Sequence, residues 1–347
     1  MLDKTKALCA FLNASHSQYH ARRYLTDILD SQGYTALREA DEWTLTPGGK
    51  YYVTRGGSAV LAFRVPEGEI RGFLMSASHS DRPTFQIKEN AEQPSGAYLR
   101  LAVEKYGGMI LSPWLDRPLS VAGRVFVAGK DGKPEAKLVN LKKDLLIIPN
   151  VAIHFNREIN NGFTYNPQTD MAPLIGLDQE LSIKKLCAEA AGVTEEEILG
   201  SDLYVYNRDK GRIMGADDSL IGSPRLDDLQ CAYATLHGFL ASKPEEFISV
   251  YALFDNEEVG SGTKQGADST FLEEFLEIVL ENVYPDKNRL WKRGFYQNSF
   301  LLSADNGHAV HPNHPEKTDP TNRPYLNGGV VLKYNGSQKY TTDGYST

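Results

Sequence analysis

Phe247-Ile-Ser-Val-Tyr-Ala-Leu-Phe-Asp-Asn-Glu-Glu-Val-Gly-Ser-Gly262 is a nearly continuous apolar run that leads into acidic residues and glycines. A run of this kind is typical of a buried strand. The adjacent carboxylates Glu257 and Glu258 are unfavourable at the end of such a strand unless a cation or a proton neutralises them. The stretch therefore predicts a buried strand with an acidic site at its carboxyl end.

Three other segments carry candidate partners for this acidic pair. One ends in His79, with Asp81 two residues later, which on a strand places both side chains on one face. A carboxylate in that place fixes the tautomer of a metal-binding histidine. Asp227 and Asp228 precede a helical pattern, and Asp305 ends a third strand pattern. One imidazole and several carboxylates suit zinc or another divalent metal, and such sites usually serve hydrolysis.

Each segment taken alone has a plainer interpretation. The histidine and Asp81 also fit a core histidine with a satisfied ring, and Asp227-Asp228 also fits a helix cap. Paired glutamates usually lie on a solvated face, but here Phe254 precedes them closely and Gly260 follows. The occurrence of all these segments in one chain favours a metal site.

Four motifs stand in order along the chain: His79-Ser-Asp81, Ser223-Pro-Arg-Leu-Asp227, Asp255-Asn-Glu-Glu-Val-Gly-Ser261 and Ser303-Ala-Asp-Asn-Gly-His-Ala-Val-His-Pro-Asn313. Two more are Val151-Ala-Ile-His154 and Gly329-Val-Val-Leu-Lys-Tyr-Asn335. Together they resemble the motif set of the aspartyl aminopeptidases, a family of two-zinc exopeptidases. The resemblance covers nearly the whole chain.

The resemblance implies a metal-binding role for four residues. Asp227 is expected to bridge two zinc ions, His79 and Asp305 to complete one site, and Glu258 to belong to the other. Glu257 is expected to act as the general base on a zinc-activated water, with Asp81 orienting the histidine.

The resemblance also implies how a substrate is held. The second zinc ion binds the free amino group, and Lys333 pairs with the acidic side chain of the first residue. His154 is expected to reach into a neighbouring subunit's active site, and His308 to line the pocket or support assembly. The expected enzyme is a homo-oligomeric metalloaminopeptidase that removes Asp or Glu from small peptides.

The end of the chain departs from the family pattern. The family closes its second zinc site with a histidine from a further C-terminal segment, whereas this sequence ends at Thr347. Thr341, Thr342, Asp343 and Ser346 are helix-capping residue types with no helix after them. The interpretation is a truncated chain whose second zinc site is incomplete.

Composition bounds the class of protein. The 347 residues, 41% hydrophobic and 24% charged, suffice for one large core or two domains. A net charge of -8 argues against a nucleic-acid partner. Cys9, Cys187 and Cys231 show no paired spacing and are expected to be reduced thiols. No signal peptide or membrane-spanning run is apparent, which predicts a cytoplasmic protein without a membrane partner.

The expected fold class is α/β, with a mostly parallel central sheet flanked by helices, similar to the zinc exopeptidases. We assign residues 1–84 and 223–347 to a catalytic domain. Residues 85–222 show short alternating runs and read as an inserted β-rich domain, to which the resemblance gives a role in dimerisation. One amphipathic helix is expected before Gly33, then a hairpin at 50–65, and helices at 229–240 and 270–282.

Other functions remain open from the sequence. The glycines from Gly260 to Gly266 invite a dinucleotide-binding interpretation, but their spacing is off by one and the nearby glutamates would repel a pyrophosphate. Within hydrolases, a broader-specificity metalloaminopeptidase or a metal-dependent deacylase is the runner-up. A catalytically inactive assembly subunit is the alternative from a different class.

Overall fold

The computed structural model describes residues 2–334, 336, 342–344 and 346. The chain divides into two compact units, Met1–Ala304 and Asp305–Thr347, which are described separately. Asn335, Thr341 and Thr347, which the sequence predictions mention, lie outside the described residues.

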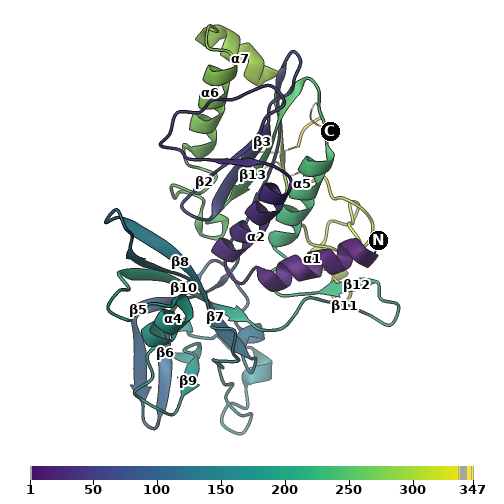
Figure 1. Cartoon of the computed structure of the whole chain (residues 1–347). Helices are drawn as coiled ribbons and strands as arrows, with labels where there is room; N and C mark the ends of the chain where they lie inside the picture. The colour runs from purple at the N-terminus through teal and green to yellow at the C-terminus, as the bar shows by residue number, and fades with distance from the viewer. Residues whose placement is uncertain (1, 335, 337–341, 345, 347) are drawn as a thin grey trace. The chain divides into compact units, whose positions relative to one another are not determined.

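The first unit contains a central sheet in the order β1-β2-β3-β13-β4-β14. Strands β2, β3 and β13 of this sheet are labelled in Figure 1. The pairs β1/β2, β13/β4 and β4/β14 are parallel, while β2/β3 and β3/β13 are antiparallel. The expected mostly parallel sheet is confirmed, and so is the hairpin at 50–65. The strands are β1 Thr35–Leu37, β2 Lys50–Arg55, β3 Ala59–Arg64, β4 Gly72–His79, β13 Phe247–Phe254 and β14 Phe300–Ser303.

The apolar run Phe247–Phe254 forms β13, which is buried on both faces of the sheet. Its side chains alternate between two hydrophobic cores. Val250 and Ala252 pack in the core that contains α6 (Phe271–Val283) and α7 (Arg289–Gln297). Tyr251 and Leu253 pack in the core formed with α1 (Leu2–Ala14), α2 (Gln18–Ser31) and α5 (Leu229–Ala241). Helices therefore cover both faces, as predicted, and α5 and α6 match the expected ranges.

The prediction of one N-terminal helix is wrong, because the structure has two. The Ser15 hydroxyl donates to the Phe11 carbonyl at 2.8 Å, after α1 has ended at Ala14. Ser17 then caps α2 by accepting from the His20 amide at 3.4 Å. Serine at these positions competes with the helical backbone for hydrogen bonds and so divides the helix.

A second sheet, antiparallel throughout, is built in the order β8-β7-β10-β5-β6-β9. Helix α4 (Ile183–Ala191) contributes Cys187 to the core on one face. The strands are β5 Thr84–Ser95, β6 Tyr98–Tyr106, β7 Leu119–Ala128, β8 Pro134–Asn140, β9 Leu174–Gly176 and β10 Gly200–Asn207. Before α5, the short strands β11 (Arg212–Met214) and β12 (Leu220–Gly222) form a hairpin that contacts α1.

Only four residues, Ser80 to Pro83, separate the end of β4 from the start of β5. The two sheets thus meet where the predicted metal-binding histidine lies. In the second unit, the described residues form turns and loops around a 3-10 helix, Pro315–Lys317. Among the described residues, no helix combines the length and apolar character needed to cross a membrane.

Candidate metal centre

His79 is the last residue of β4, and its imidazole faces carboxylates on both sides. The ring is buried, with its side chain 7% exposed. Nδ1 lies 3.3 Å from Asp81 Oδ1. Nε2 lies 3.8 Å from Asp227 Oδ1 and 3.9 Å from Glu257 Oε2. The Asp81 carboxylate thus orients the ring, and the other ring nitrogen faces the carboxylates of Asp227 and Glu257.

This donor set suits zinc. Two donors held at about 2.0–2.2 Å from one tetrahedral zinc ion lie about 3.4 Å apart, close to the separation of Nε2 from Asp227. Asp227 and Glu257 have side chains 54% and 50% exposed, so a substrate can reach this side of the imidazole. The Asp81 contact at the other nitrogen is the arrangement that orients metal-binding histidines.

Asp228 belongs to the aspartate pair for which the sequence also allowed a helix-cap interpretation. It is the N-cap residue of α5, but its side chain makes no capping hydrogen bond. Its buried Oδ2 instead accepts from the His79 amide at 3.1 Å. A carboxylate oxygen of Asp228 also lies within 4.8 Å of a His79 ring nitrogen. Asp228 therefore contacts the backbone of His79, while Asp227 faces its ring.

The two glutamates form the first residues of a 3-10 helix, Glu257–Val259, directly after β13. Asn256 precedes them in a left-handed conformation with φ 63°, which turns the chain sharply. Glu257 approaches the imidazole, whereas Glu258 lies beside Gly107, where an added Cβ would be 3.0 Å from the Glu258 Cβ. The adjacent carboxylates thus have different surroundings, as their separate predicted roles require.

The Asp81 carboxylate ties these segments together. Oδ1 accepts from the Glu257 amide at 3.1 Å, and Oδ2 accepts from the Glu258 amide at 3.2 Å. The Tyr106 hydroxyl, from the end of β6, donates to Oδ2 at 2.7 Å and accepts from Asn256 Nδ2 at 2.8 Å. One buried carboxylate therefore fixes the histidine and the glutamate turn together.

Electrostatics in this cluster follow from burial and close charges. Burial favours a low pKa for His79, but the hydrogen bond and charge of Asp81 raise that pKa to about 9. Burial favours a high pKa for Asp81, but the hydrogen bond and charge of His79 outweigh it and hold that pKa below its usual value. Burial raises the pKa of Glu258 to about 7; His79 opposes this shift, while nearby carboxylates add to it. The glutamate thus lies where a cation stabilises its charged form.

Other predicted site residues lie in the second unit or on a loop. In the second unit, Lys333 Nζ lies 3.3 Å from Asp305 Oδ2. His308 is exposed in the same unit. His154 is exposed on a loop that also exposes Phe155, whose relative exposure is 87%.

Sequence reasoning missed Tyr106 and Asn256 as parts of the centre. Tyr106 ends a strand of the second sheet, 25 residues from Asp81, and no spacing signal connects the two. Asn256 stands between two acidic residues in the quoted stretch, so its place next to the turn was visible, although its contact with a tyrosine was not.

Known proteins are similar to this chain over almost its whole length. Residues 11–347 match the family model described as "Aminopeptidase I zinc metalloprotease (M18)". The chain is 44% identical over 354 residues to a "Probable M18 family aminopeptidase 2" of Clostridium acetobutylicum, covering 99% of this chain and 81% of that protein.

Solved structures are also similar to this chain in fold. The structure titled "Cryo-EM structure of the Ape4 and Nbr1 complex" is similar with a TM-score of 0.93 at 34% identity, over 98% of this chain and 70% of that one. A Saccharomyces cerevisiae mApe1 structure, described as a dodecamer, gives 0.81 at 26% identity, over 93% and 76%. With its fold, its histidine and carboxylate cluster and its relatives, the chain belongs to the M18 family of zinc metalloaminopeptidases.

Proposed function

We propose that this chain removes acidic residues, Asp or Glu, from the N-termini of small peptides. The observation that carries the proposal is the His79 ring, with Asp81 at one nitrogen and Asp227 and Glu257 at the other. Such a site combines a place for a metal ion with a free carboxylate beside it, as peptide hydrolysis requires.

In this proposal His79, Asp227, Glu258 and Asp305 are the zinc ligands. One ion would be held by Asp227 with His79 and Asp305, and a second ion by Asp227 with Glu258. In the sequence, Asp305 comes two residues after the end of β14. Zinc held by these residues would polarise the scissile carbonyl and would lower the pKa of a bound water from about 16 towards 7.

Glu257 is the proposed general base. Its half-exposed carboxylate takes the proton from the attacking water and later gives it to the leaving amine. Asp81 holds both the His79 ring and the Glu257 amide, so the base and the ligand keep a fixed separation. Asp81 is therefore a positioning residue in this scheme.

Lys333 is proposed to select the acidic first residue. Its ammonium lies beside Asp305, which supports a position close to the reacting group, and a lysine can pair with a substrate carboxylate. His308 is proposed to line the same pocket. His154 is proposed to serve a neighbouring subunit in a homo-oligomer, which the exposed Phe155 beside it supports. A cytoplasmic location stays a prediction.

Release rates from peptides that begin with Asp, Glu or Leu, or with an acylated residue, test the proposal. Preference for Asp and Glu is expected, and Lys333→Ala is expected to lower kcat/KM on them roughly tenfold or more, while activity on Leu stays the same. Lys317→Ala, at another exposed lysine of the same unit, is the control. Preference for Leu, or equal losses on all substrates, contradicts the acidic assignment.

A further inference from the structure

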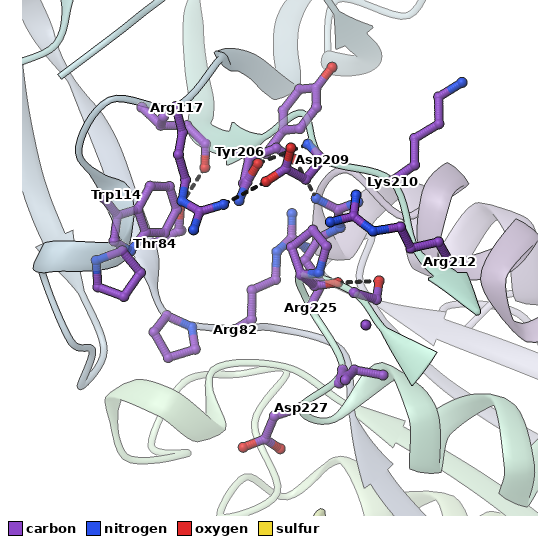
Figure 2. A pocket seen from close by; sticks show the side chains of 18 residues that line it. Arg82, Thr84, Trp114, Arg117, Tyr206, Asp209, Lys210, Arg212, Arg225 and Asp227 are labelled. Atoms are coloured by element: carbon purple, nitrogen blue, oxygen red, sulfur yellow. Dashed lines mark hydrogen bonds and ion pairs between the residues drawn. The ribbon is translucent and has the colours of Figure 1, made fainter. Parts of the chain in front are cut away.

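A cavity of about 480 Å³ opens beside the metal centre, on the side where the two sheets meet. It lies in the usual size range of small-ligand sites, about 300–1,000 Å³. Asp227 lies at one end of it (Figure 2), and its lining also includes Arg82 and Pro83, which directly follow the His79–Asp81 segment. The proposed catalytic role does not use this cavity.

The cavity is strongly cationic, although the whole chain carries a net charge of -8. Its described lining holds five cationic side chains and two carboxylates, of which Asp227 already serves the proposed metal site. The cationic residues are Arg82, Arg117, Lys210, Arg212 and Arg225. An excess of positive charge gathered in one concave place is typical of an anion-binding site.

Two of these arginines donate their hydrogen bonds to backbone carbonyls. Arg82 donates to the His16 carbonyl, and Arg225 donates to the Asn207 carbonyl at 2.8 Å and the Leu12 carbonyl at 3.2 Å. Within the described part of the chain, neither forms an ion pair with an acidic side chain. Arg82 is only 6% exposed, and its Nη1 makes no hydrogen bond to the described protein.

The two buried guanidinium groups also repel each other. Burial, and then the positive charge of Arg225, lower the pKa of Arg82 to about 9, although the charge of Asp81 opposes this shift, so Arg82 stays charged at neutral pH. Backbone carbonyls fix both groups but supply no net negative charge. An anion in the cavity relieves this repulsion, and Arg presents a planar fork that suits a carboxylate.

We infer that this cavity binds a carboxylate on the leaving part of the peptide substrate, so that the enzyme favours short peptides with a free C-terminus. The inference rests on the proposed function, because Asp227 marks the end of the cavity where the scissile bond lies. An extended residue spans about 3.3–3.6 Å, so the C-terminal carboxylate of a tripeptide lies only a few residues' length from that bond. An acidic side chain in the leaving part offers the same group.

Binding of product-like dipeptides tests the inference without relying on turnover. Calorimetric titration of the zinc-loaded protein with Ala-Ala and with Ala-Ala-NH2 is expected to show at least tenfold tighter binding of the free acid. Ala-Asp-NH2 carries its carboxylate only on the side chain. Comparison of its affinity with that of Ala-Ala tells which source of the carboxylate the cavity prefers. Equal affinities of all three peptides overturn the inference.

A variant at the rim assigns the effect to the cavity. Arg117 Nη1 pairs with Asp209 Oδ2 at 2.6 Å, while Arg212 is exposed on β11. The double change Arg117→Gln and Arg212→Gln leaves the buried arginines in place but removes two of the five cationic groups of the lining, and the preference for Ala-Ala over its amide is expected to fall about threefold or more. Lys184→Gln, at an exposed lysine of α4, is the matched control and is expected to keep the preference. An unchanged preference in the double variant overturns the inference.

Turnover separates this inference from the proposed function. Asp-Ala-Ala is expected to be cleaved with a kcat/KM at least tenfold above that of Asp-Ala-Ala-NH2, mainly through KM. Wild-type protein that binds Ala-Ala selectively but releases no aspartate contradicts the proposed function and leaves the carboxylate site standing. Protein that cleaves both substrates equally well contradicts the carboxylate site alone.

Discussion

At the scale of the residue, the carboxylate of Asp81 explains how the centre keeps its shape. It contacts the His79 ring, two backbone amides of the glutamate turn and the Tyr106 hydroxyl. A buried carboxylate that accepts several hydrogen bonds stays ionised and is held in one orientation. The side chains that it holds are therefore placed before any substrate binds.

Tyr106→Phe tests this interpretation. The change removes one donor to a buried charge, which is expected to lower the free energy of unfolding by about 1.5–3 kcal/mol and the affinity for zinc by about 10–100-fold. Chemical denaturation and competition with a chelating dye measure the two effects. Tyr98→Phe, at an exposed tyrosine of the same strand, is the control. Unchanged zinc affinity in Tyr106→Phe would show that the hydroxyl does not support the centre.

Glu257→Gln and Glu258→Gln are expected to lose activity for different reasons. Loss of a general base lowers kcat by about 10²–10⁴-fold, so Glu257→Gln should keep its zinc but lose turnover. Loss of a ligand lowers metal content, so Glu258→Gln should retain less zinc. Elemental analysis beside steady-state kinetics checks both variants. The assignment of roles fails if Glu257→Gln is the variant that loses metal.

The sequence was sufficient to identify the residues whose chemistry is unusual for their place. A histidine and paired glutamates at the ends of apolar runs stand out, and the structure brings His79, Asp227 and Glu257 together. Tyr106 could not be predicted, because a tyrosine at the end of an amphipathic strand is ordinary. Its role arises only from the way the second sheet meets the first.

At the scale of the element, the end of β6 limits the space for the glutamate turn. Gly107 has φ +76°, and a Cβ added there would be 3.0 Å from the Glu258 Cβ. The position after β6 thus requires glycine for two reasons, backbone conformation and contact with a proposed ligand.

Gly107→Ala is expected to destabilise the protein and to lower zinc content and kcat/KM. Gly96 supplies a matched control, since its φ is +61° but an added Cβ meets nothing within 4 Å. Gly96→Ala should show only the conformational penalty of about 1–2 kcal/mol. Thermal unfolding, metal analysis and kinetics compare the two variants. If both variants behave alike, contact with Glu258 has no consequence.

Element boundaries show where sequence patterns lose information. The spacing of apolar residues predicted α5 and α6 correctly, because each helix has one long buried face. The same spacing runs through the break between α1 and α2, and both helices bury residues in one core. Only the hydrogen bonds of Ser15 and Ser17 reveal the break, and apolar periodicity does not report them.

At the scale of the whole molecule, the centre joins segments that are far apart in the chain. Strands β4 and β13, the start of α5 and the end of β6 each supply one part. A bound metal ion therefore connects much of the first unit, because it neutralises carboxylates from several of these segments.

Chelation of zinc is expected to abolish peptidase activity and to lower the melting temperature by several degrees. A ligand present at 100 times its Kd stabilises the folded state by about 2.7 kcal/mol. Differential scanning fluorimetry and activity assays, before and after zinc is added back, measure the effect. Full activity in protein that elemental analysis shows to be free of metal would contradict the zinc assignment.

The position of β13 also affects how the protein is made. This strand lies between β3 and β4 in the sheet. Strands β3 and β4 therefore cannot join one sheet until β13 has been synthesised. About 170 residues separate β4 from β13, which at roughly 5–20 residues per second takes a ribosome on the order of ten to thirty seconds. During that time the apolar β4, with Phe73 and His79, stays unpaired on the nascent chain. Synthesis of this enzyme therefore depends on protection from aggregation until its last central strand emerges.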